Sequence, residues 1–399
     1  ALARIAAMDQ AKPTTALEQL AVADGWMALA DKEDPLTKNA LWRRAAFWYA
    51  TALPKLTGDA RNRADELLAE LGDKMATDAW GFAEELPWVE GPPGQLRQFR
   101  GHNSAVYALA VSSNGRWMVS GSRDGTVRSW DLATGEARAQ IASPFRRVED
   151  VAFTLRDRFV VGHGGTKELA VWDIRDGQLA NRLPTGKLYI SSAAASRNGE
   201  LIAWSLRTTG AENVMVWDAV RRRGFRTLTS PAVVSALAFS PEARRLVTGD
   251  ERNKVVCWDL TTGNQLFQGV GTYPIQQIAF SPNGRHIATL GSQDLRVWDL
   301  VRGTMAHQLA DRNYVTCMAF LADGNHLVTA GYQHEISVWN VTTGLKTQTT
   351  TIGDSTRAGY LRSIAVLPDP RAVVVADDDG NIFLWRIGDT SPAMKQLQL

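Results

Sequence analysis

Apolar and polar residues alternate and then meet a turn at seven places in the C-terminal three quarters of the chain. The seven stretches are VYALAVSSNG (106–115), VEDVAFTLRD (148–157), ISSAAASRNG (190–199), VSALAFSPEA (234–243), IQQIAFSPNG (275–284), VTCMAFLADG (315–324) and LRSIAVLPDP (361–370). Alternation with a period of two predicts a strand with one buried face, and the Gly, Asn, Pro and Asp residues predict the turn after it. The region therefore consists mainly of short strands.

A tryptophan lies 23–27 residues after the first residue of each of these stretches. Neighbouring tryptophans in this series are 40–46 residues apart, at positions 130, 172, 217, 258, 298, 339 and 385. Self-similarity at such a period indicates a repeat architecture, in which each unit buries its faces by stacking on its neighbours.

The residues at and after each tryptophan form a second recurring motif. They read WDLATG (130–135), WDIRDG (172–177), WDAVRR (217–222), WDLTTG (258–263), WDLVRG (298–303), WNVTTG (339–344) and WRIGDT (385–390), and Gly101-His102 opens the first unit. Together the motifs resemble the WD40 repeat family over residues 96–399. The resemblance implies an all-β fold of seven four-stranded blades, numbered 1 to 7 in chain order, around a central channel.

The resemblance also implies a chain of hydrogen bonds in blade 1, through His102, Ser120, Asp124 and Trp130. It would join indole, hydroxyl, imidazole and carboxylate, because buried polar groups must be paired. A Ser-His-Asp trio also suggests a protease, but a trio that ends on a tryptophan N–H is structural. Of this set blade 4 keeps only Thr248 and Trp258, and blade 7 only Asp379 and Trp385. We expect apolar packing to hold the other blades.

A closed ring needs its last blade to borrow a strand, since an open ring leaves two exposed edges. Residues Leu96–Arg100 directly precede Gly101-His102 and have no earlier strands of their own. We predict that they complete blade 7. The alternative is that Lys395–Leu399 fill the same position from the C-terminus.

Residues 1–75 predict a small helical arm of three helices. Thr15 and Glu18 form a capping box at the start of the first, and Asp34-Pro35 and Thr57-Gly58 precede the others. The predicted apolar faces are Ala16, Leu20, Ala23, Met27 and Ala30, then Leu41, Ala45, Trp48, Tyr49, Ala52 and Leu53, then Ala64, Leu67, Leu68 and Leu71. Ala23, Trp26, Ala45, Tyr49 and Ala52 make the arm similar to a tetratricopeptide repeat, although its first loop is too long. We expect Trp26, Trp42 and Trp48 to be core residues.

Residues 76–95 are a connector rich in proline and glycine, so neither a helix nor a central strand fits. The connector also contains Trp80, Phe82 and Trp88. Large aromatic side chains favour burial, so we expect the connector to lie against the propeller or the helices.

Charge is divided unevenly along the chain. Residues 1–95 hold 10 Lys and Arg against 15 Asp and Glu, a net of −5, so the remainder carries +7 of the total of +2. Of the 34 basic residues in the remainder, 29 are arginine, which pairs readily with carboxylates. This bias favours an acidic partner, which includes the chain's own arm, against the alternative of a simple solvated surface. A field of +7 spread over three hundred residues argues against nucleic acid.

No catalytic, metal or cofactor motif emerges from the sequence. Gly164–Lys167 and Gly186-Lys187 lack the spacing of a phosphate-binding loop, and the six histidines lack zinc spacing. We expect His163, His286, His307, His326 and His334 to be surface or turn residues, and Cys257 and Cys317 to be buried free thiols. The sequence therefore predicts no cofactor and no enzyme activity.

The family resemblance directs attention to the loops that precede each blade's first strand, because this ring face often contacts partners. The residues just before those strands are Ala105, Arg147, Tyr189, Val233, Pro274, Tyr314 and Tyr360, with Tyr273 one step earlier. Loops of the same face add Arg123, Arg146, Arg207, Arg252, Arg312 and Arg357. Tyrosine and arginine are enriched at binding hot spots, so we predict a partner site here. The alternative is that the tyrosines only cap the packing of the blades.

These observations favour a non-catalytic scaffold for other proteins, within a multiprotein complex. The alternative is a sensor or targeting module of a larger enzyme whose catalytic part lies upstream. Residue 1 is alanine, which indicates a processed, truncated or renumbered chain. Free thiols and the lack of a signal peptide favour the cytoplasm, with the periplasm as the alternative if a leader was removed. No apolar run is long enough for a membrane span.

Overall fold

The computed structural model describes residues 93–388, except for 156, 175–176, 186–187, 211, 293, 312–313 and 353–358. It also describes residues 13–30 and, from the rest of the first 67 residues, 5, 8, 11, 41, 42, 45, 48, 49, 52, 55–61, 63, 64 and 67. The chain divides into two compact units, Ala1–Phe82 and Ala83–Leu399.

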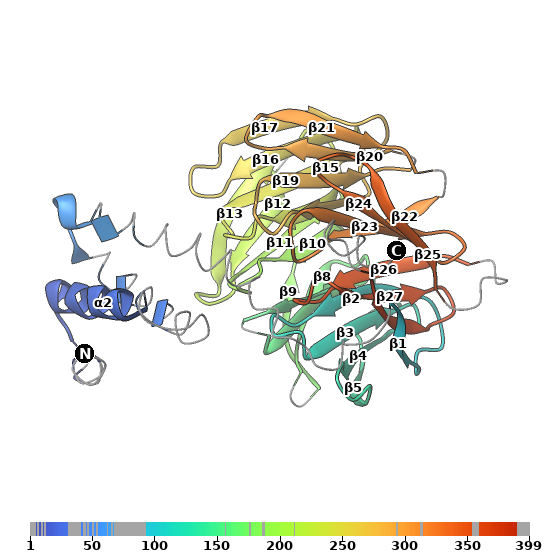
Figure 1. Ribbon diagram of the computed structural model, residues 1–399, viewed down its shortest axis with the longest axis horizontal. Coiled ribbons are helices and arrows are strands. Elements are labelled where there is room, and N and C mark those ends of the chain that lie inside the picture. The colour runs from blue at the N-terminus through green and yellow to red at the C-terminus, as the bar shows by residue number, and fades with distance from the viewer. Residues whose placement is uncertain are drawn as a thin grey trace, which may run out of the picture. The chain divides into compact units, whose positions relative to one another are not determined.

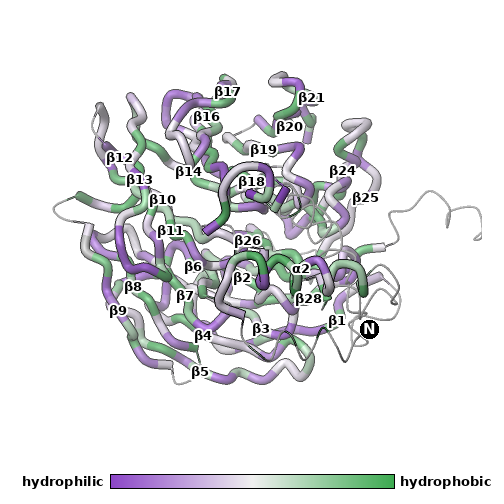
Figure 2. The backbone as a smooth tube through the Cα atoms, turned by 90° about the vertical axis from the view of Figure 1, so that its left-hand side faces the viewer, coloured by the Kyte–Doolittle hydropathy of each residue, from purple (hydrophilic) through white to green (hydrophobic). Residues whose placement is uncertain are grey.

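The described part of the second unit is a ring of seven antiparallel four-stranded sheets (Figure 1). Each sheet is one blade, and the chain runs through its blade from the channel outwards. This confirms the all-β, seven-bladed propeller that the repeat pattern predicts. Along the strands, hydrophobic and hydrophilic residues follow one another within a few positions (Figure 2), as in sheets that are half buried.

The strands fall into four sets by their position in the blade. The innermost strands are β2 (Val106–Val111), β6 (Asp150–Thr154), β10 (Ile190–Ala195), β14 (Val234–Phe239), β18 (Gln277–Phe280), β22 (Val315–Phe320) and β26 (Leu361–Val366). The second strands are β3 (Trp117–Ser122), β7 (Phe159–His163), β11 (Leu201–Leu206), β15 (Arg245–Asp250), β19 (His286–Leu290), β23 (His326–Gly331) and β27 (Ala372–Asp377).

The third and fourth strands complete each blade. The third strands are β4 (Thr126–Asp131), β8 (Glu168–Asp173), β12 (Glu212–Asp218), β16 (Lys254–Asp259), β20 (Leu295–Asp299), β24 (Glu335–Asn340) and β28 (Ile382–Arg386). The outermost strands are β5 (Ala137–Ala142), β9 (Gln178–Pro184), β13 (Arg223–Thr229), β17 (Gln265–Val270), β21 (Thr304–Leu309), β25 (Lys346–Thr351) and, from the start of the unit, β1 (Gly94–Phe99).

Strand β1 closes the ring. It pairs antiparallel with β28, with Phe99 opposite Ile382, so the outer strand of blade 7 comes from the N-terminal side of the propeller. Figure 1 shows β1 beside the last strands of the chain. The predicted closure by Leu96–Arg100 is thus confirmed, with the strand starting two residues earlier and ending at Phe99. The alternative strand, 395–399, lies outside the described residues.

The recurring tryptophan of each blade lies in the third strand, where it packs between neighbouring blades. Trp130 is 1% exposed and meets Phe99 edge to face at 5.7 Å between ring centroids. The same apolar cluster includes Leu109 of blade 1 and Val374 and Leu384 of blade 7. Burial of large apolar area between sheets is the main force that holds blades together.

Turns between the first and second strands are organised by a Ser-x-Asn-Gly sequence in three blades. In blade 1 the Ser112 hydroxyl donates to Asn114 Oδ1 at 2.7 Å and accepts the Trp117 N–H at 2.9 Å. Gly115 follows with a φ of 69°, a conformation that glycine adopts at little cost. The turn geometry that the sequence signals therefore rests on short local hydrogen bonds.

In the first unit, helix α2 (Ala16–Ala30) follows the helical residues Ile5 and Met8. Its capping box is confirmed, because the Thr15 N–H donates to Glu18 Oε2 at 3.2 Å and the Glu18 N–H donates to Thr15 Oγ1 at 3.3 Å. The predicted apolar face of this helix is confirmed at Ala23 and Ala30 but is rotated, because its other three residues are only partly buried. The fully buried face comprises Gln19, Val22, Ala23, Trp26, Leu29 and Ala30, whereas Ala16, Leu20 and Met27 are partly buried.

The other predicted helices are described only in part. Leu41, Ala45, Trp48, Tyr49 and Ala52 are helical and buried as expected. Trp26, Trp42 and Trp48 belong to one apolar cluster with them and with Ala64, which confirms their core role. The residues that start the second helix, and the connector up to residue 92, lie outside the described residues. The tetratricopeptide likeness and the domain boundaries remain predictions.

The expectation for the histidines is wrong except at His334, which is buried but lies in a turn, whereas that for the cysteines is confirmed. His163, His326 and His334 are buried, and His286 and His307 lie in strands β19 and β21. Short strands of a closed ring leave few exposed positions, so imidazoles are buried beside carboxylates. His326 Nδ1, for example, lies 2.6 Å from Asp323 Oδ2. Cys257 and Cys317 are buried free thiols.

Deleting residues 94–99 is expected to lower the melting temperature by on the order of 10 °C, because blade 7 loses its outer strand and Trp130 loses Phe99. Thermal unfolding followed by circular dichroism measures the change. Deleting residues 395–399 is the matched control and is expected to shift the melting temperature little. The reverse order of the two deletions would contradict closure by β1.

Candidate functional site

A continuous chain of hydrogen bonds crosses blade 1 from its third strand to the loop before its first. Trp130 Nε1 donates to Ser120 Oγ at 2.9 Å, and Ser120 Oγ lies 2.7 Å from His102 Nε2. His102 Nδ1 then lies 2.8 Å from Asp124 Oδ2. Because the indole can only donate, the serine hydroxyl must donate onwards to Nε2, and Nδ1–H donates to the carboxylate.

Electrostatics keep this chain in one protonation state near neutral pH. Burial lowers the pKa of His102, although the neighbouring Asp124 opposes the shift. Burial alone would raise the pKa of Asp124, but hydrogen bonds from Thr126, His102 and the Asn103 N–H outweigh it and lower the pKa to about 2. Ser120 is 0% exposed, so no substrate reaches its hydroxyl. The geometry is that of a structural clamp.

The sequence underestimates how far this polar core survives in the other blades. Trp258, Trp298 and Trp339 donate from Nε1 to Thr248, Thr289 and Thr329 at 3.0, 2.9 and 3.1 Å. The expectation that, apart from blade 1, only blade 4 keeps the hydroxyl is therefore wrong. The threonines at the same register in blades 5 and 6, Thr289 and Thr329, were not recognised from the sequence.

In blade 7 a second carboxylate, two residues before Asp379, is the buried one. Asp377, which is 3% exposed, accepts the N–H groups of Asp379 and Asn381 at 2.9 and 2.8 Å. Asp379 itself is exposed. The buried turn carboxylate thus lies two residues earlier than the motif suggests.

Replacing Ser120 with alanine is expected to cost about 2–4 kcal/mol of unfolding free energy, because Trp130 Nε1 and His102 Nε2 both lose a buried partner. Ser129→Ala is a matched control on the next strand, since the Ser129 hydroxyl is buried and has no hydrogen-bond partner among the described residues. Urea unfolding of both variants measures the difference. Equal stability of the two variants would contradict the clamp.

On the ring face formed by the loops before the first strands, three tyrosines gather at the junction of blades 6 and 7. The ring centroids of Tyr314 and Tyr360 are 6.1 Å apart, edge to face, and those of Tyr332 and Tyr360 are 5.0 Å apart. The Tyr332 N–H donates to the Tyr314 carbonyl at 3.0 Å, and Tyr332 forms a β-bridge with Tyr360. Tyr314 remains 45% exposed.

Arg362 joins this tyrosine cluster from the second position of β26. Its guanidinium carbon lies 4.7 Å from the centre of the Tyr360 ring. Its Nε and Nη2 donate to the two carboxylate oxygens of Asp378 at 2.5 and 3.1 Å, and this pair raises the pKa of Arg362. Cation–π contact and bidentate pairing together hold the guanidinium in one orientation.

The other predicted residues lie apart on different blades. Arg147 pairs with Glu149 at 2.5 Å, and the Lys167 ammonium lies 4.8 Å from the centre of the Tyr189 ring. Tyr273 is 41% exposed, and Arg123 and Arg252 are exposed in loops of blades 1 and 4. Arg146 and Arg207 are also exposed, and Arg207 lies 3.8 Å from Glu251. The two other arginines of the predicted face, Arg312 and Arg357, lie outside the described residues.

The rule used to select these residues was partly wrong. Strands β6 and β18 begin at Asp150 and Gln277, so Arg147 and Pro274 lie three residues before them, not one. The sequence reasoning missed Tyr332 and Arg362. A usable signal existed for both, since Tyr332 follows β23 and Arg362 follows Tyr360 directly.

The innermost strands surround a channel of about 420 Å³ lined by residues of all seven blades, among them Tyr107, Asp150, Ser192, Gln277 and Arg362. Asp150 keeps some contact with the channel space. Burial by the channel walls nevertheless raises the pKa of its carboxyl to about 7, against hydrogen bonds from the Val151 and Ala193 N–H groups. The channel is therefore a place where a charge costs free energy.

The contribution of Asp150 to stability is expected to fall as the pH rises from about 4 to about 7, because the folded state holds the Asp150 proton up to a pKa of about 7 whereas the unfolded chain releases it near 3.8. Asp150→Asn removes this titration. Its melting temperature is expected to fall less than that of the unchanged protein over the same pH range, as measured by thermal unfolding. Parallel pH profiles would show that the carboxyl is solvated.

Two general surveys of the described residues complete the site. Within the described part of the chain, no three His, Cys, Asp or Glu side chains lie close enough to hold a metal ion together. Among the described helices, none has both the length and the apolar character needed to cross a bilayer.

Blades closed by a borrowed strand, with inner strands around a channel, define the chain's second unit as a seven-bladed β-propeller. The family description "WD domain, G-beta repeat" matches residues 94–131, 224–259, 265–299 and 302–340. These segments contain the tryptophans of blades 1, 4, 5 and 6. WD40 repeats are therefore found in these four blades of the propeller, as the motifs indicate.

Individual proteins are similar at low identity. The chain is 22% identical over 210 residues to Protein tipD of Dictyostelium discoideum, which covers 51% of the chain and 33% of that protein. It is 27% identical over 246 residues to Small ribosomal subunit protein RACK1 of Caenorhabditis elegans, covering 50% of the chain and 74% of the relative. Eukaryotic translation initiation factor 3 subunit I of Meyerozyma guilliermondii is 22% identical, with shares of 61% and 75%. The chain thus spans a third of tipD and about three quarters of the other two.

Proposed function

We propose that the protein is a non-catalytic scaffold whose propeller binds an acidic segment of a partner protein at the tyrosine cluster of blades 6 and 7. The observation that carries the proposal is the grouping of Tyr314, Tyr332 and Tyr360 around the fixed guanidinium of Arg362. Aromatic rings and arginine are the side chains that dominate binding energy in protein interfaces.

The geometry of Arg362 supports an acidic ligand. Its Nε and Nη2 are used by Asp378, whereas Nη1 has no partner among the described residues. A carboxylate of the partner can accept from Nη1 without breaking the existing pair, and the tyrosine rings exclude water from one side. Charge-assisted hydrogen bonds in such a setting are stronger than those in open solvent.

The charge of the propeller and the names of two relatives add support. Residues 96–399 carry 34 basic against 27 acidic residues, which attracts acidic segments and raises their rate of encounter. RACK1 is named a small ribosomal subunit protein, and the yeast relative is named a subunit of an initiation factor. Each of these two names is that of a component of a larger assembly.

Tyr314→Ala with Tyr360→Ala is expected to weaken capture of partners at least about tenfold, because two hot-spot side chains are lost. Immobilised full-length protein is incubated with lysate, and bound proteins are quantified by mass spectrometry. Poly-glutamate, but not poly-lysine, should compete for the same partners.

Leu345→Ala is the control for this experiment. Leu345 is 66% exposed in the turn before β25 of blade 6, outside the tyrosine cluster, so its replacement should leave capture unchanged. Unaltered capture by the folded double tyrosine variant would show that the tyrosines only cap blade packing.

A further inference from the structure

One position of the blade register separates blade 3 from the others. The residue that lies two positions beyond the β-partner of the recurring tryptophan accepts the indole N–H in blades 1, 4, 5 and 6. In blade 3 the recurring tryptophan is Trp217, its partner is Ile202, and the residue two positions on is Trp204. An indole therefore replaces the hydroxyl that would bind Trp217.

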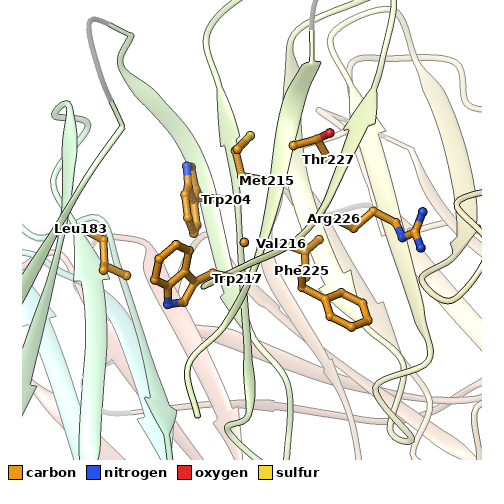
Figure 3. Close-up of a pocket in the computed structure, with 9 residues that line it drawn as sticks. Leu183, Trp204, Met215, Val216, Trp217, Phe225, Arg226 and Thr227 are labelled. Carbon is orange, nitrogen blue, oxygen red and sulfur yellow. The ribbon is translucent and has the colours of Figure 1, made fainter. Parts of the chain in front are cut away.

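This replacement opens the side of blade 3. Trp204 is 5% exposed and fills the space beneath, whereas Trp217 is only partly buried, unlike the recurring tryptophans of blades 1, 2, 4, 5 and 6. Beside the two rings lies a groove of about 530 Å³, lined by Leu183 of β9, Trp204, Met215, Trp217, Phe225 and Arg226. Figure 3 shows the two indoles together, with Phe225 and Arg226 on the other side of the groove.

Two polar features of the groove lack partners within the described chain. The Nε1 of Trp204 is buried and has no acceptor, and the Nε of Arg226 is likewise without one. Both atoms are shielded from solvent by the chain itself, so the groove presents the ring faces rather than these donors to a ligand. The Nη2 of Arg226 is held by the Thr261 carbonyl at 2.6 Å, so the guanidinium does not have to be ordered on binding.

The rim of the groove is apolar and basic. Phe225 is 44% exposed and Val220 is 58% exposed. Arg222 and Arg223 are exposed and directly precede the groove residue Gly224, and neither pairs with an acidic residue in the described part of the chain. By contrast, Arg221 pairs with Asp218 at 2.8 Å. The rim therefore offers two uncompensated positive charges beside an apolar recess.

We propose that this groove is a second docking site, which takes an aromatic or branched apolar side chain of a partner protein flanked by acidic residues. The apolar side chain lies against Trp217 and Phe225, and the carboxylates meet Arg222 and Arg223. A second copy of this chain is disfavoured, because a twofold contact would bring the same arginines together. The site is on the side of the ring and is independent of the tyrosine cluster.

The probe is a synthetic peptide with one tryptophan between pairs of glutamates, titrated into the full-length protein by calorimetry. Two control peptides replace the tryptophan by alanine or the glutamates by glutamine. We expect each control peptide to bind at least about tenfold more weakly. Failure of the probe to bind with a Kd below about 1 mM would overturn the proposal.

Phe225→Ser tests the apolar wall and is expected to weaken the probe about tenfold. Its matched control is Leu266→Ser, since Leu266 occupies the equivalent register in β17 of blade 4 and is 55% exposed. Arg222→Gln with Arg223→Gln should weaken binding several-fold and reduce its salt dependence, whereas Arg302→Gln in the equivalent turn of blade 5 should not.

Trp204→Thr tests the origin of the groove. Threonine restores the hydroxyl that accepts the indole N–H in other blades, so Trp217 should become buried, its fluorescence should shift to shorter wavelength, and the probe should be lost. Equal binding by Phe225→Ser and Leu266→Ser would overturn the site even if Trp204→Thr failed to fold. A dimer in sedimentation analysis that Phe225→Ser abolishes would assign the groove to a second copy instead.

Discussion

Every blade of this protein depends on the closure of the ring. A four-stranded sheet has two faces to bury, and each blade here covers one face of its neighbour. An open series of blades would leave one face exposed at each end, so the ring must close for every blade to be buried on both sides. The pairing of β1 with β28 supplies the missing contact. Phe99 illustrates the consequence, since it belongs to blade 7 yet packs on Trp130 of blade 1. The strand pairing and the packing of β2 on β26 and β27 together join the two ends of the repeat series.

Blade 1 stands at this seam and carries the complete hydrogen-bond chain. His102 comes from the loop that immediately follows β1, so the clamp from His102 to Trp130 fixes the end of the borrowed strand to the third strand of its own blade. Interior blades are held by neighbours on both sides within the continuous chain, and of these blades 4, 5 and 6 keep a single Trp–Thr hydrogen bond. The most extensive hydrogen-bond chain thus lies in the blade where the ring is closed.

The sequence predicts what is periodic and fails where the outcome depends on three-dimensional neighbours. Strand number, blade number and the closing strand follow from spacing, because each repeat obeys the same local rules. The burial of His163 and His334 does not follow, since imidazoles look polar in any window of sequence. The rotation of the α2 face towards Val22 and Leu29 depends on the helices that pack on it.

The candidate sites divide in the same way. Tyr314 and Tyr360 could be selected because they precede strands, which is a local property. Tyr332 and Arg362 join them only because β23 and β26 meet across the boundary of two blades. Arg147 and Tyr273 also precede strands but lie on other blades. Selection by residue type and by position before a strand therefore included residues outside the cluster.

A single register position shows how a repeat fold changes use without changing shape. Ser120 at that position completes a clamp, threonine in blades 4 to 6 keeps one bond, and Gly162 in blade 2 leaves the Trp172 Nε1 unpaired yet buried under Phe145. Trp204 in blade 3 instead is a large buried side chain, and Trp217 is only partly buried and lines a groove. The backbone register is the same in each case, with the tryptophan opposite the residue two positions earlier. Because neighbouring blades hold the sheet in place, a substitution at this position can replace an internal hydrogen-bond acceptor by a side chain that lines the proposed docking groove.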